Sequence, residues 1–233
     1  MITVYYTQIS HFEAEEIFHK YLERVDEERK SKVMRMQGPE GRLRSLAAGS
    51  LLQFGICRKL GIEPFRAAPF SFKQMEGGKP IWPGKEEIHF NLSHSGDYAC
   101  CAVADQPVGV DIQVCDGLRS ALAKRFFTEK DNQRLRECSG QEQENLFYRL
   151  WSIKESYIKL TGKGMSQGLS SFEICWDQEK KYADKEETGG EGRIIAEEKT
   201  MACFKEEHGI EGYGACLCMF EKEPVCWQEI CLK

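Results

Sequence analysis

Two stretches of the chain share one pattern, and this internal similarity constrains the fold more than any other feature. Residues 98–110, YACCAVADQPVGV, and residues 214–227, GACLCMFEKEPVCW, each contain an apolar strand pattern with cysteines, an acidic turn and a Pro-Val step. Such a similarity is either a chance match or an internal repeat, and as a repeat it predicts an α+β fold with two similar halves packed face to face and a cleft between them. The interface between such halves is a common location for a ligand site.

A long helical pattern precedes each of these stretches. The first pattern covers residues 42–60 and the second covers residues 142–161, and each ends shortly before a glycine, which is a common C-terminal helix stop. We therefore divide the chain into an N-terminal half, residues 1–105, and a C-terminal half, residues 106–233.

The rest of the chain alternates between further helical and strand patterns. A charged helical pattern runs from Ala14 to Met36 and is broken by Gly38-Pro39. Residues 177–193 are charged and contain glycine, and we interpret them as a mobile hairpin tip or loop without function. The other expected elements are strands in ITVYYTQI, IHFNLSHS, YACCAVA, VGVDIQV and SSFEICW, a helix over 120–136, and two strands at the end of the chain.

The composition is that of an ordinary soluble protein, with 41% hydrophobic and 30% charged residues. No window approaches the roughly 18 consecutive apolar residues of a membrane helix, and the first residues have no signal-peptide pattern. We therefore expect a cytoplasmic protein without a membrane partner. A formal net charge of −5 argues against nucleic acid as the partner, since nucleic-acid binders usually carry a basic field.

The cysteines do not form a recognisable disulfide or zinc pattern. There are eleven of them, an odd number, their spacing is irregular, and no Cys-x-x-Cys pair occurs. Free cysteine packs as a small buried hydrophobic side chain. We therefore expect the cysteines to serve packing rather than metal binding or redox chemistry.

Basic residues concentrate between positions 29 and 44. This segment holds one acidic residue, Glu40, against six basic ones: Arg29, Lys30, Lys32, Arg35, Arg42 and Arg44. On an acidic protein such a cluster marks either a local anion site or a solvated helix face, and the pattern alone leaves both interpretations open.

Two acidic side chains stand out within apolar patterns. In PVGVDIQV the strand period of two puts Asp111 and Gln113 on one face, although aspartate is depleted in strands. In LWSIKESYIKLTGKG a helix puts Glu155 and Lys159 on one face, with Lys154 about 100° away from Glu155. Asp111 and Glu155 could together supply carboxylate oxygens of the kind that Mg²⁺ prefers. A wet strand end and a solvated helical ion pair are the alternatives.

Two further polar stretches have competing explanations. FNLSHSGDY places Ser93 and His94 at a strand end, where His94 is either a structural histidine or a phosphate contact. No Gly-x-Ser-x-Gly sequence surrounds a serine, which argues against a hydrolase triad. In FFTEKDNQRL, Thr128 and Asp131 have the spacing of a capping box, so we expect helix capping for Asp131 first and a metal site second.

Five motifs, in their order and spacing, resemble those of the Sfp-type 4′-phosphopantetheinyl transferases. They are GGKP, FNLSHSGDY, VGVDIQ, KRFFTEKD and LWSIKESYIKLTGKG, and the resemblance spans about Arg29 to Ser171. It implies a monomer of two α+β halves related by a pseudo-twofold axis, with the active site in the cleft between them. The implied activity is Mg²⁺-dependent transfer of the phosphopantetheine arm of coenzyme A to a serine of an apo acyl or peptidyl carrier protein, releasing 3′,5′-ADP.

The resemblance also implies roles for residues of the C-terminal half. Asp111 matches the family's metal-binding aspartate, Glu155 matches the metal-binding glutamate of its W-x-x-K-E motif, and Lys159 matches the lysine at the pyrophosphate. Glu155 is also the expected base for the carrier serine, and Lys159 the expected partner of the departing 3′,5′-ADP. Gln113 departs from the family, which often has glutamate there. We expect its amide oxygen or a water to complete the metal site, with weaker metal binding and retained activity.

In the N-terminal half, the resemblance implies contacts to coenzyme A. The residues at its phosphates are matched by Lys79, Ser93 and His94. The family also has basic residues at the adenosine 3′-phosphate, and the residues similar to them here are Arg44, Arg29 and Lys32.

Two other functions remain as alternatives. A non-catalytic module that binds coenzyme A or a carrier protein would account for the missing acid at Gln113, although such a module has no need for both Glu155 and Lys159 at their spacing. Metal-dependent hydrolysis of coenzyme A would use the same cation and would need no carrier protein.

Overall fold

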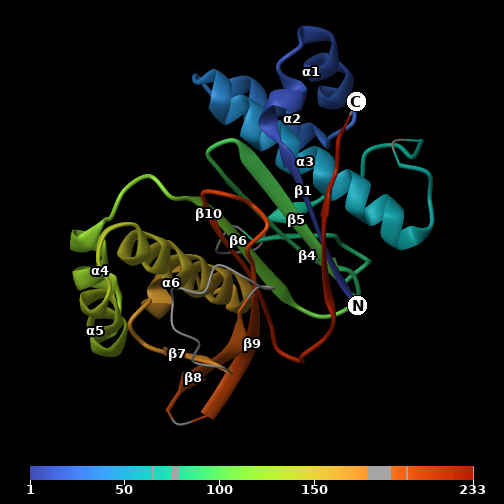
Figure 1. Cartoon of the computed structure of the whole chain (residues 1–233). Helices are drawn as coiled ribbons and strands as arrows, with labels where there is room; N and C mark the ends of the chain where they lie inside the picture. Colours follow the sequence, from blue (N-terminus) through green and yellow to red (C-terminus); the bar gives the residue numbers. More distant parts are fainter. Residues whose placement is uncertain (65, 75–78, 178–189, 198, 233) are drawn as a thin grey trace. The chain divides into compact units, whose positions relative to one another are not determined.

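The computed structural model describes residues 1–64, 66–74, 79–177, 190–197 and 199–232 (Figure 1). The helices are η1 (Ile9–Phe12), α1 (Glu15–Leu22), α2 (Glu27–Arg35), α3 (Pro39–Leu60), α4 (Ser120–Phe126), α5 (Glu129–Glu137), α6 (Gly140–Thr161) and η2 (Gly164–Gln167). The strands are β1 (Ile2–Gln8), β2 (Lys73–Gln74), β3 (Pro80–Ile81), β4 (His89–Ser95), β5 (Tyr98–Ala104), β6 (Val108–Val114), β7 (Glu173–Trp176), β8 (Glu191–Ala196), β9 (Lys199–Glu207), β10 (Tyr213–Met219) and β11 (Val225–Glu229). None of these helices is long and apolar enough to cross a bilayer.

The expected α+β class is confirmed, and the chain forms two compact units. The first unit comprises Met1–Val108 together with Glu223–Lys233, and the second comprises Gly109–Lys222. Each contains a 22-residue helix, α3 or α6, packed on its own sheet. Both helices end at a glycine in the left-handed conformation, Gly61 with φ 68° and Gly162 with φ 70°, as the sequence predicts. The pseudo-twofold relation of the halves stays a prediction.

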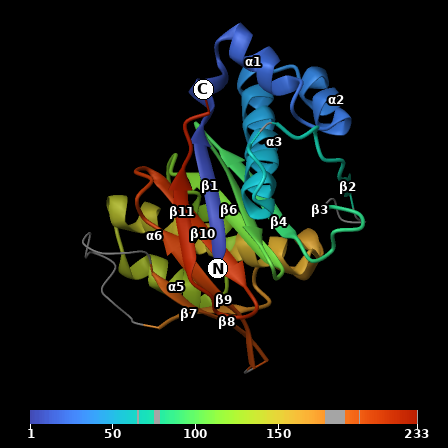
Figure 2. The ribbon, with the colours of Figure 1, turned by 90° about the vertical axis from the view of Figure 1, so that its right-hand side faces the viewer.

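The first unit is built on a four-stranded sheet in the order β11-β1-β5-β4. β5 is antiparallel to both β1 and β4, whereas β11 runs parallel to β1, beside which it lies in Figure 2. α3 covers one face of this sheet and buries an apolar stripe against it. Members of this core include Leu46, Leu51, Ile56, Phe90 and Cys101.

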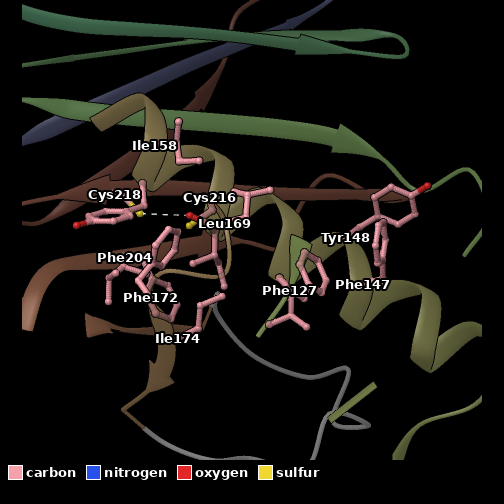
Figure 3. Close-up of a cluster of buried hydrophobic side chains, with 14 of the residues drawn as sticks. Phe127, Phe147, Tyr148, Ile158, Leu169, Phe172, Ile174, Phe204, Cys216 and Cys218 are labelled. Carbon is pink, nitrogen blue, oxygen red and sulfur yellow. Dashed lines mark hydrogen bonds between the residues drawn. The ribbon is translucent and has the colours of Figure 1, made fainter. Parts of the chain in front are cut away.

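The second unit is built on a five-stranded sheet in the order β6-β10-β9-β8-β7, and α6 lies along β10. The helix contributes Phe147, Ile153 and Ile158 to a core that also contains Phe172, Ile174 and Phe204. Figure 3 shows that this core is rich in aromatic rings, with Phe147 beside Phe127 and with Phe172, Ile174 and Phe204 grouped together. Cys216 and Cys218 of β10 belong to this core. All eleven cysteines are free thiols and six are buried, in agreement with the packing role expected for them.

In each of the two similar stretches of sequence, the first strand belongs to the sheet of one unit and the strand that follows belongs to the sheet of the other unit. β5 leads into β6, which joins the sheet of the second unit beside β10, while β10 leads into β11, which joins the sheet of the first unit beside β1. The expected division at 105/106 therefore differs from the compact units at the end of the chain. The reason is the parallel pairing of β11 with β1, which is a long-range contact that no local pattern reveals.

Three expected elements are subdivided or extended. The helix expected over 14–36 is two helices, because Asp26 caps α2 by accepting a hydrogen bond from the Arg29 backbone N–H at 2.9 Å. The helix expected over 120–136 is likewise divided by a cap at Thr128. Four strands, not two, follow residue 190, since the charged residues of β8 and β9 obscure their alternation.

The hairpin tip or loop expected at 177–193 lies between β7 and β8, which pair antiparallel, and it overlaps β8. Its residues 191–193 belong to that strand, whereas residues 178–189 lie outside the described part of the chain. The interpretation of those residues as a mobile loop without function stays a prediction.

A buried carboxylate, Glu206 of β9, connects three elements of the second unit. It accepts hydrogen bonds from Nε and Nη2 of Arg149 on α6, at 2.8 and 2.9 Å, and from Nε1 of Trp176 on β7 at 2.8 Å. Burial alone would raise the pKa of Glu206, but hydrogen bonds from Arg149, His208 and Trp176 lower it to about 2 from the usual 4.5. The carboxylate therefore stabilises this unit in its ionised form.

This pair of pKa values predicts a pH dependence of stability. Because the folded-state pKa is the lower one, the contribution of Glu206 is present above pH 4.5 and is lost as the pH falls toward 2. We expect the loss to be about 3 kcal/mol in the wild-type chain and absent in Glu206→Gln, measured as the free energy of unfolding in urea between pH 5 and pH 2. Glu211→Gln, which changes an exposed glutamate of the same unit, should keep the full pH dependence. If the free energy of unfolding of Glu206→Gln fell between pH 5 and pH 2 as much as that of the wild type, this assignment would be contradicted.

Candidate functional site

The second unit brings Asp111, Glu155 and Lys159 together. Lys159 of α6 donates from Nζ to Oδ1 of Asp111 at 2.7 Å and to the Val110 carbonyl oxygen at 3.1 Å, so it holds β6 through both a side chain and the backbone. Glu155 lies one helical turn earlier on the same face of α6. Along this face Trp151, Glu155 and Lys159 are all partly exposed, whereas the residues between them are mostly buried.

The charges of these side chains affect Glu155. Burial and the nearby Asp111 carboxylate raise its pKa above 4.5, and Lys159 opposes the rise. The two carboxylates are thus close enough to repel each other, and the ammonium of Lys159 attracts both. Such an arrangement favours any additional cation that both carboxylates reach.

The donor set at this point fits a hard divalent cation. Gln113 lies two residues after Asp111 on the same strand face and is partly exposed, so an amide oxygen accompanies the two carboxylates. Within the described residues no group of three or more histidine, cysteine, aspartate or glutamate side chains gathers at one point. Mg²⁺ is usually held by one or two carboxylates together with waters and substrate phosphates, and Asp111 with Glu155 meets that requirement.

In the first unit, β4 separates the two residues that the motif FNLSHSGDY places side by side. Ser93 is buried and His94 is exposed, because successive residues of a strand point to opposite faces. Arg44 of α3 reaches the end of this hairpin, where its Nη1 donates to the Gly96 carbonyl oxygen at 3.1 Å and to Glu40 at 3.3 Å. The period of two in a strand, if applied to the sequence, would have predicted that Ser93 and His94 point to opposite faces of β4.

Lys79 lies beside a histidine that the sequence did not single out. Its Nζ donates to the Val108 carbonyl oxygen at 3.3 Å, and burial lowers its pKa. Burial and the positive charge of Lys79 also lower the pKa of His89, the first residue of β4. His89 and Ser93 share one face of β4, and the alternation of that strand was the signal that could have identified His89.

The basic segment of α2 is only partly available to a ligand. Burial lowers the pKa of Arg29, whose aliphatic stem lies against Gly49 of α3: a Cβ at position 49 would come within 3.0 Å of Arg29 Cγ. Lys32 extends outward, and partial burial together with Arg29 lowers its pKa. Two cations thus lie close together here, and a bound anion would relieve their repulsion.

Two family models match the chain in succession. The model described as 4′-phosphopantetheinyl transferase, N-terminal, matches residues 13–106, and that of the 4′-phosphopantetheinyl transferase superfamily matches residues 107–218. The 4′-phosphopantetheinyl transferase Sfp of Bacillus subtilis strain 168 is 30% identical over 200 residues, which cover 85% of this chain and 84% of that protein. The chain belongs to the 4′-phosphopantetheinyl transferase superfamily.

Further relatives agree with this assignment. The 4′-phosphopantetheinyl transferase ffp of Bacillus subtilis is 32% identical over 197 residues, which cover 83% of this chain and 81% of that protein. Another 4′-phosphopantetheinyl transferase of Bacillus subtilis is 37% identical over 150 residues, which cover 64% of this chain and 66% of that protein. The resemblance to the Sfp-type transferases is thus confirmed, while the roles of single residues stay predictions.

Two residues of the transferase motifs serve the core of the second unit instead of its site. Lys154, fully buried, pairs with Oδ2 of Asp131 at 2.9 Å and donates to the carbonyl oxygens of Leu169 and Phe172 at 2.9 and 3.2 Å. Asp131 and Thr128 form the expected capping box at the start of α5. The capping explanation of Asp131 is confirmed, and its carboxylate also pairs with Lys154 and Arg134.

This buried ion pair predicts that Lys154 acts on stability. Lys154→Met removes the nearer of two cations beside the buried Asp131 carboxylate and leaves Arg134, whose Nη1 lies 3.5 Å from Oδ1, so we expect a loss of about 3 kcal/mol in the free energy of unfolding, measured by urea denaturation. The double variant Lys154→Met/Asp131→Asn should recover part of that loss. Lys163→Met, at an exposed lysine just beyond the helix, should stay within about 0.5 kcal/mol of wild type. A stable Lys154→Met chain would contradict this role.

Proposed function

We propose that this chain transfers the 4′-phosphopantetheine arm of coenzyme A to a serine of an apo acyl or peptidyl carrier protein and releases 3′,5′-ADP. The observation that carries the proposal is the convergence of Asp111, Glu155 and Lys159 at the contact between β6 and α6. Two carboxylates and one ammonium at one point suit a substrate that carries a pyrophosphate and a bound divalent cation. The family models over residues 13–218 support the same reaction class.

In this reaction the carrier serine oxygen forms a bond to the phosphorus next to pantetheine, and the bond from that phosphorus to the bridging oxygen breaks. Because phosphoryl transfer requires mainly positioning and charge neutralisation, the site has little covalent work to do. Mg²⁺, when bound, would polarise the pyrophosphate oxygens. Asp111, Glu155 and Gln113 are the residues that would hold it.

The chain's own groups would handle the proton and the leaving group. Glu155 is the group that we assign as acceptor of the serine proton, directly or through a metal-bound water, because it lies at the point where Asp111 and Lys159 meet. Lys159 would turn from Asp111 toward the departing 3′,5′-ADP once Asp111 has a stronger cationic partner. Lys79, Ser93, His94, Arg44, Arg29 and Lys32 of the first unit would contact the phosphates of coenzyme A.

The direct test is intact-mass spectrometry of a panel of apo carrier proteins incubated with this chain, coenzyme A and Mg²⁺, with and without a chelator. Metal-dependent gain of one phosphopantetheine per carrier is the expected result. Measurable coenzyme A binding without a gain on any carrier would instead favour the non-catalytic module. Release of 3′,5′-ADP without a carrier would favour hydrolysis.

Removing one carboxylate should abolish the metal-dependent reaction. We expect Asp111→Asn to lower the transfer rate by at least about 100-fold, because the variant keeps the size of the side chain and removes its charge. Asp105→Asn, which changes an exposed aspartate paired with Lys59, should retain the wild-type rate in the same assay. Full activity of Asp111→Asn would remove the metal model.

Restoring an acid at position 113 should strengthen the metal dependence. We expect Gln113→Glu to shift the Mg²⁺ titration of transfer to concentrations lower on the order of tenfold, since it adds a third carboxylate near the cation. Gln133→Glu adds the same charge on the exposed side of α5 and controls for net charge. An unchanged titration would place Gln113 outside the groups that contact the cation.

A further inference from the structure

Strand β6 and helix α6 meet at Gly109 with no room for a side chain. A Cβ at this position would lie 2.0 Å from the Ser156 carbonyl oxygen, 2.3 Å from the Leu160 nitrogen and 2.9 Å from the Leu160 Cα. Cβ atoms essentially never come within 3.0 Å of such neighbours. All three neighbours are backbone atoms, so no change of rotamer can make space. Glycine is therefore required for this approach of the two elements.

The contact lies within the proposed site. Gly109 precedes Asp111 by two residues on the strand, and on the helix Ser156 directly follows Glu155 while Leu160 directly follows Lys159. The hydrogen bonds from Lys159 to Val110 O and to Asp111 Oδ1, at 3.1 and 2.7 Å, connect the same helix and strand next to this contact, which we call the Gly109 joint. The separation of the two backbones at Gly109 thus sets how far Asp111 lies from the turn of α6 that carries the other two groups.

A second close approach in the same unit provides the comparison. At Gly214 of β10 a Cβ would lie 2.7 Å from the Tyr148 carbonyl oxygen and 2.9 Å from its carbonyl carbon. Tyr148 is seven residues, about two helical turns, before Glu155 on α6. Gly214 therefore serves the packing of α6 on its sheet at a distance from Asp111.

We propose that Gly109 is a positioning residue of the transferase site: by letting β6 touch the backbone of α6, it places the Asp111 carboxylate where it and Glu155 share one divalent cation. This inference rests on the proposed function. A misplacement of about 1 Å at a reacting centre can cost about 100-fold in rate, and we expect a cation site built from the same groups to be similarly sensitive.

The test measures cation binding without substrate. Mn²⁺ serves as the probe, and the unbound ion is quantified by electron paramagnetic resonance in the presence of the full chain, with neither coenzyme A nor carrier. An added Cβ forces the backbones apart by about 1 Å to reach 3.0 Å, and we expect Gly109→Ala to weaken Mn²⁺ binding on the order of 10- to 100-fold. Gly214→Ala should lower the melting temperature and leave Mn²⁺ affinity within about twofold of wild type.

A second substitution distinguishes positioning from loss of packing. Asp111→Glu lengthens the side chain by one methylene, about 1.5 Å, without changing its charge. In the wild-type background we expect it to weaken Mn²⁺ binding at least about tenfold. In the Gly109→Ala background the longer side chain bridges the widened joint, so the double variant should bind Mn²⁺ more tightly than Gly109→Ala alone. Asp111→Glu is thus expected to weaken Mn²⁺ binding in the wild-type background and to strengthen it in the Gly109→Ala background. A merely structural role of Gly109 cannot produce this change in the direction of the effect.

The outcomes separate this inference from the function on which it rests. A wild-type chain that binds no Mn²⁺ would overturn the proposed cation site and this inference with it. Wild-type binding combined with unchanged affinity in a folded Gly109→Ala chain would overturn the inference alone. Should Gly109→Ala fail to fold, Asp111→Glu in the wild-type background decides: retained affinity would show that the site tolerates the displacement and would overturn the inference.

Discussion

The ion pair between Lys159 and Asp111 is the interaction around which the second unit organises its chemistry. It joins α6 to β6, the strand at the end of the sheet order, while the helix itself lies along β10. The backbone contact at Gly109 makes the pair possible, because two elements separated by an ordinary side chain could not bring Asp111, Glu155 and Lys159 to one point. The same contact makes the site sensitive to changes in packing that touch no ligand.

The motif W-x-x-K-E-x-x-x-K contains two lysines, of which one is buried and the other is partly exposed. Lys154 enters the core, where Asp131, two carbonyl oxygens and the rings of Phe127 and Phe172 surround its ammonium. Lys159 stays partly exposed beside Asp111. Five residues of helix correspond to about 500°, so the two side chains leave the helix in clearly different directions. One helix thus combines a structural ion pair with the candidate catalytic groups.

Much of this was readable from the sequence. The helix stops at Gly61 and Gly162, the capping box at Thr128 and the strand around Asp111 follow from local patterns whose physics involves only neighbouring residues. The relation between the two similar stretches was also visible. The exchange of β6 and β11 between the units was not, because strand pairing across more than 200 residues leaves no trace in local periodicity.

The sequence by itself indicated the family, through the resemblance of five motifs in their order, and the α+β class and the residue types of the candidate site, which follow from spacing along single helices and strands. The tertiary structure alone decided which charges meet. In the folded chain Lys154 pairs with Asp131, and Lys159 pairs with Asp111. His89 lies near Lys79, and Gly109 contacts the backbone of α6. Each of these contacts joins elements distant in the chain, and their distances are set by packing, which a one-dimensional pattern does not contain.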